Sequence, residues 1–175
     1  MISPRATDVA APYLGLVATF NTLLGAFLWL ADRSGRRLPD RLSAEDVLIA
    51  GMATQRLSRL LTKAEVTSPL RAPFTRVEEK GGPAEVEEAP RGTGLRAAVG
   101  KLITCPYCIG VWLAALFNYA FVLWPSHTRL VARIFATAAV ADFLQPLYVR
   151  LTAAPSDQEI PHRRRPEPAE WSRAA

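Results

Sequence analysis

The fold is decided by residues 107–124, which read YCIGVWLAALFNYAFVLW. This stretch carries no charge, and its one amide is Asn118. On its N-terminal side it is extended by the apolar residues Leu102 and Ile103. A helix of this length rises roughly 30 Å, the thickness of the hydrocarbon core of a bilayer. We therefore predict a transmembrane helix over residues 102–124.

Two more apolar stretches flank this one at a distance. Residues 11–31 read APYLGLVATFNTLLGAFLWLA and carry no charge, whereas residues 130–149 read LVARIFATAAVADFLQPLYV and include Arg133 and Asp142. The first stretch is predicted to be an uncleaved anchor, because bulky Trp29 stands where signal-peptide cleavage requires a small residue. The sequence thus predicts an all-α integral membrane protein with transmembrane helices over 11–31, 102–124 and 130–149.

The basic charge of the chain is distributed as in a membrane protein. The net charge is +5 over 175 residues, but the cations do not gather on one aromatic-interleaved face, so no nucleic-acid partner is predicted. Residues 33–101 hold 13 Lys and Arg and the tail from Arg150 holds five, whereas residues 1–10 and the turn 125–129 hold one each. The positive-inside rule then predicts a short extracytoplasmic N-terminus over 1–10, a cytoplasmic segment over 32–101 and a disordered cytoplasmic tail over 150–175.

Residues 43–64 are predicted to form an amphipathic helix. Ser43 and Asp46 make an imperfect capping box, and Ile49, Ala53 and Leu57 fall on one side of a helical wheel beside a narrow basic stripe. This pattern suits a helix lying in the inner headgroup region against anionic lipid. An amphipathic helix packed on the protein's own spans fits the pattern equally well.

Residues 65–94 are rich in proline and glycine and are predicted to be a loop. Its first half is expected to be an ordered strap near the membrane surface, and its second half a mobile segment crowded with glutamates. Arg71 and Arg76 are the candidates for holding the strap to lipid phosphate, to Glu78 or Glu79, or to a protein partner. Ordinary solvated arginines are the alternative.

The sharpest local motif is Cys105-Pro106-Tyr107-Cys108 at the start of the second span. The glutaredoxins carry CPYC as a dithiol, but the residues before this motif look helical and those after it look transmembrane, which a thioredoxin-like fold does not allow. Four interpretations stay open for Cys105 and Cys108. They are a redox pair, an acylation site, half of a zinc site shared across a dimer, and small residues without chemistry.

Each predicted span carries one strongly polar residue near its middle: Asn21, Asn118 and Asp142. Such groups normally face the interior of a bundle, so we expect a hydrogen-bonded cluster that fixes helix packing. The functional alternative is an oligomeric proton or ion permeation unit around Asp142.

The segments TSPLRAPFTR and LITCPYCIGVW, with PRGTGLR between them and ADFLQ after them, resemble a bacterial membrane family known as domain of unknown function 1360. The resemblance runs from about Gly51 to Tyr148, and the family includes a protein named for sporulation. It implies a small integral membrane protein of uncharacterised activity and brings no catalytic residue, and with the three predicted spans we expect a multi-pass protein of the bacterial cytoplasmic membrane. We therefore expect a non-enzymatic interaction or scaffold protein without metal or cofactor. Its expected partners are the anionic inner leaflet and either a second copy or another membrane protein, with membrane thiol-redox chemistry as the alternative.

Overall fold

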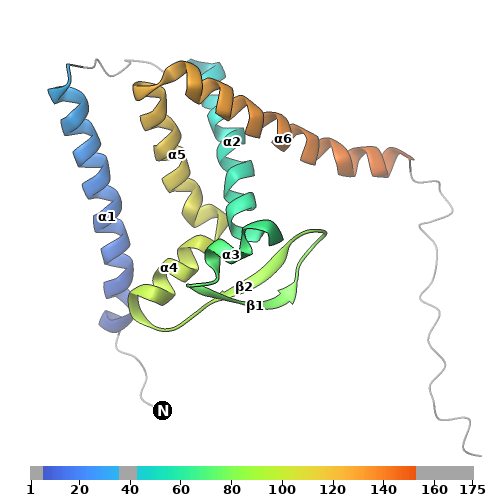
Figure 1. Cartoon of the computed structure of the whole chain (residues 1–175), viewed down its shortest axis with the longest axis horizontal. Coiled ribbons are helices and arrows are strands. Elements are labelled where there is room, and N and C mark those ends of the chain that lie inside the picture. The colour runs from blue at the N-terminus through green and yellow to red at the C-terminus, as the bar shows by residue number, and fades with distance from the viewer. Residues whose placement is uncertain (1–5, 36–42, 153–175) are drawn as a thin grey trace, which may run out of the picture. The chain divides into compact units, whose positions relative to one another are not determined.

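The computed structural model describes residues 6–35 and 43–152 (Figure 1). The chain is mostly helical and forms two units, residues 1–141 and 142–175. The elements in chain order are α1 (Ala6–Arg33), α2 (Ala44–Lys63), the 3-10 helix η1 (Glu65–Thr67), α3 (Ser68–Arg71), β1 (Thr75–Lys80), β2 (Val86–Pro90), α4 (Gly94–Thr104), α5 (Pro106–Leu123) and α6 (Pro125–Thr152). The predicted basic tail beyond Thr152 lies outside the described residues.

Three helices are long and apolar enough to cross a membrane: residues 11–33 of α1, all of α5 and all of α6. They coincide with the three predicted spans, so the helices themselves are confirmed. Many of their large apolar side chains are exposed, among them Leu14, Leu23 and Leu116. Exposed apolar surface of this extent marks contact with lipid or with another protein.

One predicted span is interrupted. Residues 102–124 were expected to form one helix, but α4 ends at Thr104 and α5 begins at Pro106. The break lies at Cys105, whose φ of −106° and ψ of 109° are extended. The reason is local, because a residue before proline is pushed out of the helical region and proline has no N–H to continue the helical ladder.

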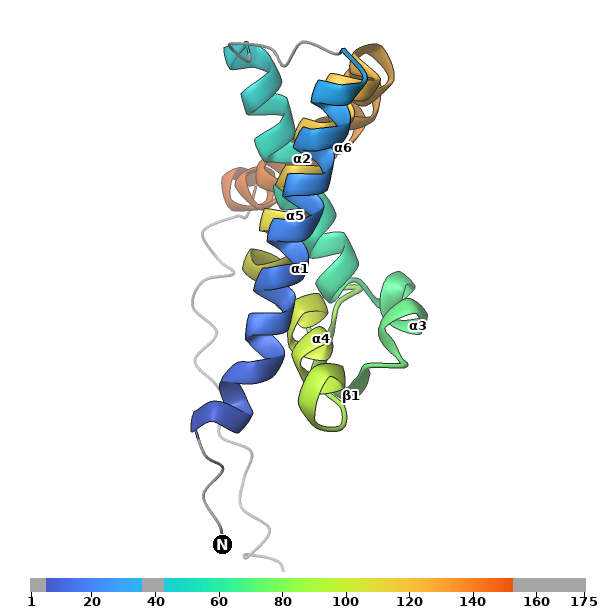
Figure 2. The ribbon, with the colours of Figure 1, turned by 90° about the vertical axis from the view of Figure 1, so that its left-hand side faces the viewer.

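The amphipathic helix α2 does not lie apart from the spans. Figures 1 and 2 show it beside α5, the helix with which it makes its most extensive contact. Ala50 and Ala53 of α2 pack against Phe117 and Phe121 of α5, and Ala132 of α6 completes this core. Of the two locations that the sequence left open for this helix, the structure shows packing on α5, because small residues on α2 let the two helices approach closely.

The N-terminal end of α2 lies against the start of α6. Arg129 donates two hydrogen bonds to the Asp46 carboxylate, from Nε to Oδ1 at 2.8 Å and from Nη2 to Oδ2 at 2.9 Å. Arg133 forms a second, more exposed pair with Glu45 at 2.6 Å. The sequence-based topology put the segment 32–101 and Arg129 on opposite sides of a membrane. The direct pairing of Asp46 with Arg129 brings these two residues together at one end of α2, and it is the basis of the different topology proposed below.

At its other end α2 carries a folded unit, residues 64–104, which we call the head. Within it, β1 and β2 form an antiparallel hairpin in which Thr75 faces Pro90 and Val77 faces Glu88, with an irregularity between Val77 and Glu79. The all-α assignment and the predicted loop 65–94 are thus corrected. The glutamates that suggested a mobile loop are paired with cations of α2: Arg59 with Glu85 and Lys63 with Glu87, each at 2.6 Å.

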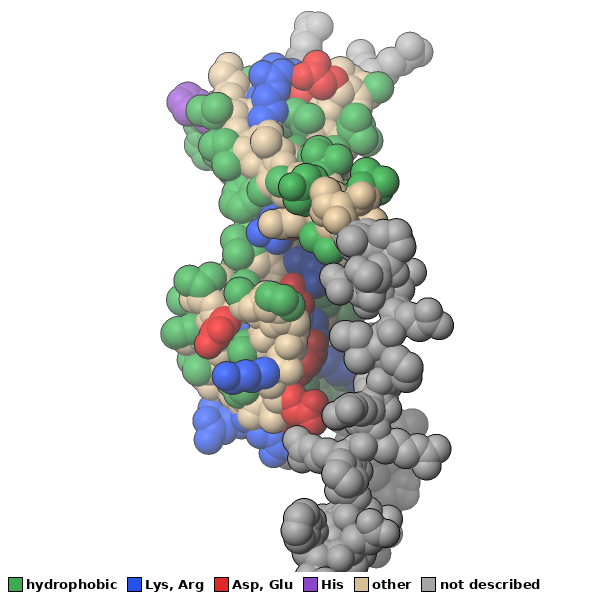
Figure 3. Space-filling model, turned by 90° about the vertical axis from the view of Figure 1, so that its right-hand side faces the viewer, with side chains coloured by type: hydrophobic (Ala, Val, Ile, Leu, Met, Phe, Trp, Pro, Cys, Tyr) green, Lys and Arg blue, Asp and Glu red, His purple; other side chains and the backbone are tan. Residues whose placement is uncertain are grey.

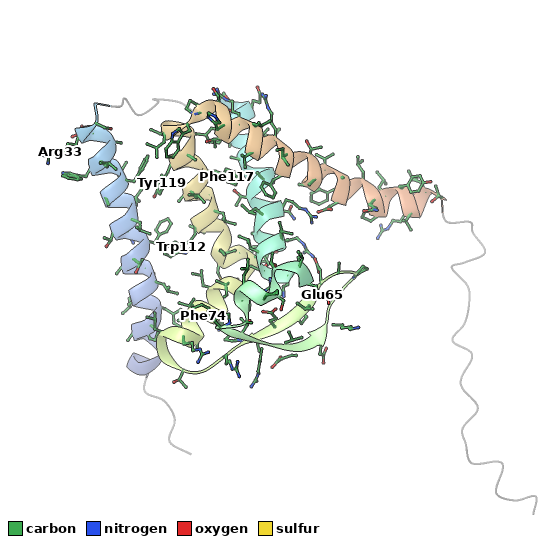
Figure 4. All side chains as sticks on the ribbon, in the orientation of Figure 1. Arg33, Glu65, Phe74, Trp112, Phe117 and Tyr119 are labelled. Carbon is green, nitrogen blue, oxygen red and sulfur yellow. A yellow bond between two sulfur atoms is a disulfide. The ribbon has the colours of Figure 1, made fainter. Side chains whose placement is uncertain are left out.

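Helix α4 holds the hairpin against the helical part. A Cβ atom on Gly100 would lie 2.6 Å from the backbone oxygen of Phe74, so only glycine permits this approach. Arg96 of α4 also donates to the carbonyl oxygen of Pro73, with Nε at 2.9 Å. Helix α1 contacts α4, and its rings meet those of α5 in the pairs Phe20–Trp112 and Phe27–Tyr119. Trp112 and Tyr119 accordingly point toward α1 in Figure 4.

Charged side chains gather in two zones of the surface in Figure 3, one over the head and one at the far end of α2 and α5. The zones correspond to the ion pairs at the two ends of α2. On the face shown, charged side chains are thus concentrated at the two ends of the α2–α5 pair.

Candidate functional site

The centre of the head is the side chain of Arg71, which is 3% exposed. Its five N–H groups all have acceptors. Nε and Nη2 bind the two oxygens of Glu88 at 3.0 and 2.9 Å. Nη1 donates to the carbonyl of Leu61 and to the Thr67 hydroxyl, and Nη2 also donates to the carbonyl of Ala64. The guanidinium is thus buried, ion-paired and fully hydrogen-bonded, which is the condition for a buried charge to be tolerated.

Arg71 also completes the C-terminus of α2. The last carbonyls of a helix have no partner within the helix, and they form the negative end of its dipole. Arg71 binds the carbonyls of Leu61 and Ala64, and the Thr67 hydroxyl donates to that of Leu60 at 2.6 Å. The segment that follows α2 therefore folds back and caps it, which fixes α3 and the hairpin on the end of this helix.

Glu88 is the counter-charge of Arg71, and its side chain is 1% exposed. Besides the two bonds from Arg71 it accepts bonds of 2.6 Å from the hydroxyls of Ser68 and Thr75. Burial by itself raises the pKa of the Glu88 carboxyl, but the hydrogen bonds from Arg71, Ser68 and Thr75 and the charge of Arg71 outweigh it, so the pKa lies below its ordinary value of 4.5. Glu88 is therefore ionised at neutral pH.

The two arginines predicted to hold the strap have different environments. Arg71 does not reach the surface, so the expectation that it binds lipid phosphate or a partner is wrong, and it contacts neither Glu78 nor Glu79 but Glu88. Arg76 is exposed and pairs with Glu78 at 3.3 Å, one of the options foreseen from the sequence. An exposed pair of this kind contributes little to stability, so Arg76 stays a candidate for contact with lipid or a partner.

Cys105 and Cys108 lie at the junction of α4 and α5 and are joined in a disulfide, with Cα atoms 5.2 Å apart. Cys105 is the N-cap of α5, and its Sγ accepts a hydrogen bond from the backbone N–H of Cys108 at 3.2 Å. Pro106 occupies the first turn, where its missing N–H costs nothing. Cys105 is partly buried and Cys108 is exposed. The pair thus lies at the amino end of an apolar helix, with Cys108 the more exposed of the two residues.

A groove lies beside the cysteine motif, between α2 and α5. Its volume is about 450 Å³, and it is lined by Gly51, Thr54, Gln55, Ser58 and Arg59 of α2 and by Pro106, Tyr107, Gly110, Val111 and Ala114 of α5. One wall is polar and the other largely apolar. Tyr107, between the two cysteines, is 89% exposed.

Two of the three polar residues of the predicted spans donate hydrogen bonds within their own helices. Asn21 donates to the carbonyl of Val17 and Asn118 to that of Ala114, each at 2.8 Å and within its own helix. Asp142 belongs to the second unit of the chain. The structure therefore does not join Asn21 and Asn118 to each other, and a cluster that includes Asp142 stays a prediction.

Two residues important for the fold were missed from the sequence. Glu88 was grouped with solvated acids of a loop, and Asp46 was recognised only for its position at a helix start. Their partners, Arg71 and Arg129, lie 17 and 83 residues away in the chain. No local sequence pattern predicts ion pairs between residues so far apart in the chain. Within residues 6–35 and 43–152, no three His, Cys, Asp or Glu residues come together as metal ligands.

A comparison with known protein families identifies the family of this chain. Residues 49–148 match the family described as "Protein of unknown function (DUF1360)". The chain belongs to this family. The matched range begins in α2 and includes the whole head, the cysteine pair, α5 and most of α6, whereas α1 lies outside it. The resemblance suggested by the sequence motifs is thereby confirmed.

Two curated relatives come from Bacillus subtilis (strain 168). One is "Sporulation protein YjcA", 31% identical over 104 residues that cover 58% of this chain and 88% of the relative. The other is "UPF0713 protein YngL", 26% identical over 109 residues, 61% of this chain and 80% of the relative. No solved structure matches the chain.

Proposed function

We propose that this DUF1360 protein is a multi-pass protein of the bacterial cytoplasmic membrane whose head is a rigid surface for binding another protein. The observation that carries the proposal is the Arg71–Glu88 network, which fixes the hairpin to the end of α2. A head anchored in this way presents its outer face at a constant distance from the apolar helices. Neither a catalytic residue nor a cofactor enters the proposal, and its link to sporulation rests on the relative of that name.

The outer face of the head has the composition of a binding surface. The side chains of β1 after Thr75 are exposed and include both charges, and Val77 among them is 58% exposed. Val66 and Leu70, in η1 and α3, are 78% and 73% exposed. Exposed apolar residues within a charged surface are typical of interaction sites.

The proposal includes a membrane topology in which α1 and α5 cross side by side, while α2, which is not one of the three helices long and apolar enough to cross by themselves, lies along α5. Support comes from the antiparallel packing of α2 on α5 and from the ion pairs at both ends of α2. The end of α1 and the starts of α2 and α6 then lie on one side, and the head lies on the other. Among the described residues, the segment from Arg59 to Lys101 carries eight Lys and Arg against three at the opposite end, which favours a cytoplasmic head. The eight are Arg59, Lys63, Arg71, Arg76, Lys80, Arg91, Arg96 and Lys101, and the three are Arg33, Arg129 and Arg133.

Single-cysteine labelling tests the topology. In a Cys105→Ser, Cys108→Ser background, cysteines at Ser34, Ser126 and Glu79 are labelled with a membrane-impermeant maleimide in intact cells and again after lysis. We expect Ser34→Cys and Ser126→Cys to behave alike and Glu79→Cys to behave oppositely. Equal labelling of Ser34→Cys and Glu79→Cys, with Ser126→Cys opposite, would restore the topology predicted from charge alone.

Photocrosslinking in cells tests the binding role. A photoreactive amino acid at Val77 should give a discrete protein adduct that disappears when Glu88→Gln loosens the head, at unchanged protein level. The same amino acid at Leu14 of α1 is the matched control and should crosslink to lipid or to the chain itself. Adducts from Val77 that are only lipid, or that persist in Glu88→Gln, would refute a docked head as the binding surface.

A further inference from the structure

We propose that the Cys105–Cys108 disulfide is a thiol–disulfide exchange site that takes two electrons from a dithiol. The sulfur of Cys108, the more exposed residue, is the point of attack, and Cys105 is the leaving thiolate. This activity goes beyond the binding role proposed for the head, because it needs neither the hairpin nor a protein docked on it.

The two sulfurs are not equivalent in the structure. Cys108 is exposed, whereas Cys105 is partly buried at the N-cap of α5. Exchange proceeds by attack of a thiolate on one sulfur, and access decides which sulfur is attacked. An incoming thiolate therefore reaches Cys108 Sγ before Cys105 Sγ.

The environment of Cys105 makes its sulfur the better leaving group. Its Sγ already accepts a hydrogen bond from the N–H of Cys108 at 3.2 Å, within the first turn of α5. A thiolate at a helix N-terminus is stabilised by such N–H groups and by the positive end of the dipole, and a thiol with a lowered pKa leaves faster. The hydrogen bond that holds the disulfide is therefore in place to hold the thiolate once the bond breaks.

A purely structural role explains the pair less well. The disulfide joins residues three apart, and crosslinks that close short loops remove the least entropy from the unfolded chain. The start of α5 is already defined by Pro106 and by the extended backbone of Cys105. The disulfide is also accessible to reductants at the exposed residue Cys108, unlike a disulfide buried in the core.

The reaction balances without another reagent. The first thiolate of the dithiol attacks Cys108 Sγ, a mixed disulfide forms, and the Cys105–Cys108 bond breaks to release the Cys105 thiolate. The second thiolate of the dithiol then attacks the first sulfur of the dithiol, which is bonded to Cys108 in the mixed disulfide, and releases the Cys108 thiolate. The dithiol is oxidised to its disulfide, the protein is reduced by two electrons, and the two protons of the dithiol pass to the two cysteines or to solvent.

The groove beside Tyr107 indicates what kind of dithiol fits. It combines a polar wall that includes Gln55 and Ser58 with an apolar wall that includes Val111 and Ala114. A dithiol on an apolar chain gains contact there that a small polar dithiol does not. We divide the rate constant of the oxidised protein with each reagent by the rate constant of that reagent with a model disulfide. This ratio should be larger for dihydrolipoamide than for dithiothreitol.

Adduct mapping on the unmodified chain is the primary test. The oxidised full-length protein in detergent is treated with glutathione, quenched in acid, alkylated and analysed by peptide mass spectrometry. We expect glutathione on Cys108 and the alkyl group on Cys105. Glutathione on Cys105, or no adduct after a time in which a model peptide disulfide reacts, would overturn the proposal.

Single-cysteine variants give an independent measurement. In reduced Cys108→Ser the remaining Cys105 thiol should titrate at least about one pH unit below the ordinary value of about 8.5, and in reduced Cys105→Ser the Cys108 thiol should titrate near it. The pKa is read from the pH dependence of alkylation, with the double variant as the blank. Equal pKa values for the two thiols would contradict the assigned roles. Stoichiometric conversion of dihydrolipoamide to lipoamide by the wild type, and none by the double variant, completes the test.

Discussion

Replacing Glu88 with glutamine should release the hairpin from the end of α2. Glutamine has nearly the same shape, so the change removes the charge and leaves the Arg71 guanidinium buried without a counter-charge. Both side chains of the pair are at most 3% exposed. Removing one partner of a buried ion pair costs about 3–5 kcal/mol. At about 1.4 kcal/mol per factor of ten, that cost corresponds to a rise of two to three or more orders of magnitude in the opening equilibrium of the hairpin.

Hydrogen exchange is the appropriate assay, because it reports opening of the hairpin while the apolar helices stay folded. The amides of β1 and β2 should exchange faster in Glu88→Gln by this factor, and those in the middle of α5 should not change. Glu79→Gln is the matched control, since Glu79 is exposed on the same hairpin and its replacement should have little effect. Hairpin exchange in Glu88→Gln within a factor of three of the control would refute the assigned role of the network.

The pH dependence of the same opening has a defined sign. The pKa of Glu88 lies below its ordinary value in the folded head. Its ionised form therefore contributes stability that is complete above about pH 4.5 and is lost as the pH falls through the folded pKa. The wild-type hairpin should open more readily on acidification in this range, and the difference between wild type and Glu88→Gln should shrink.

Three further substitutions probe the contacts around the head and α2. Gly100→Ala should destabilise the head by about 1–3 kcal/mol, because the new Cβ would clash with the backbone oxygen of Phe74; the measurement is exchange of the hairpin amides. Asp46→Asn should lower the thermal stability of the protein in detergent by weakening the two bonds to Arg129, with a loss below that of a fully buried pair because Arg129 is 44% exposed. Ala53→Leu, at a position with no exposed surface, should push α2 away from α5 and cost about 1–3 kcal/mol in the same thermal assay.

Matched controls separate these effects from general damage. Gly51→Ala should be tolerated, because a Cβ atom at this position would meet nothing within 4 Å. Glu45→Gln should cost less than Asp46→Asn, since Glu45 and Arg133 are both more than half exposed. Leu48→Ala replaces a side chain that is 64% exposed on α2 and should leave the α2–α5 contact intact. The comparisons are Gly51→Ala with Gly100→Ala, Glu45→Gln with Asp46→Asn, and Leu48→Ala with Ala53→Leu. An equal loss of stability in the two variants of a pair would count against the contact that the pair tests.

The sequence was sufficient to predict the local features. The apolar stretches 11–31, 107–124 and 130–149 predicted helices because each is long and carries few or no charges. The start of α2 at Ser43 and the break before Pro106 also have local causes, a side-chain cap and a missing N–H. The predicted span 102–124 nevertheless ran across this break, because the apolar residues of α4 run on into those of α5.

Only the tertiary structure decided what lies next to what. The apolar side of α2 suits lipid and protein equally, and its contact with Phe117 and Phe121 settled the choice. Likewise the glutamates of residues 85–88 look solvated in the sequence, whereas in the structure they pair with Arg59, Lys63 and Arg71. The physical reason is that hydrophobicity and helix breaking depend on neighbouring residues in the chain, but the partner of a charge or of an apolar face depends on residues that only folding brings close.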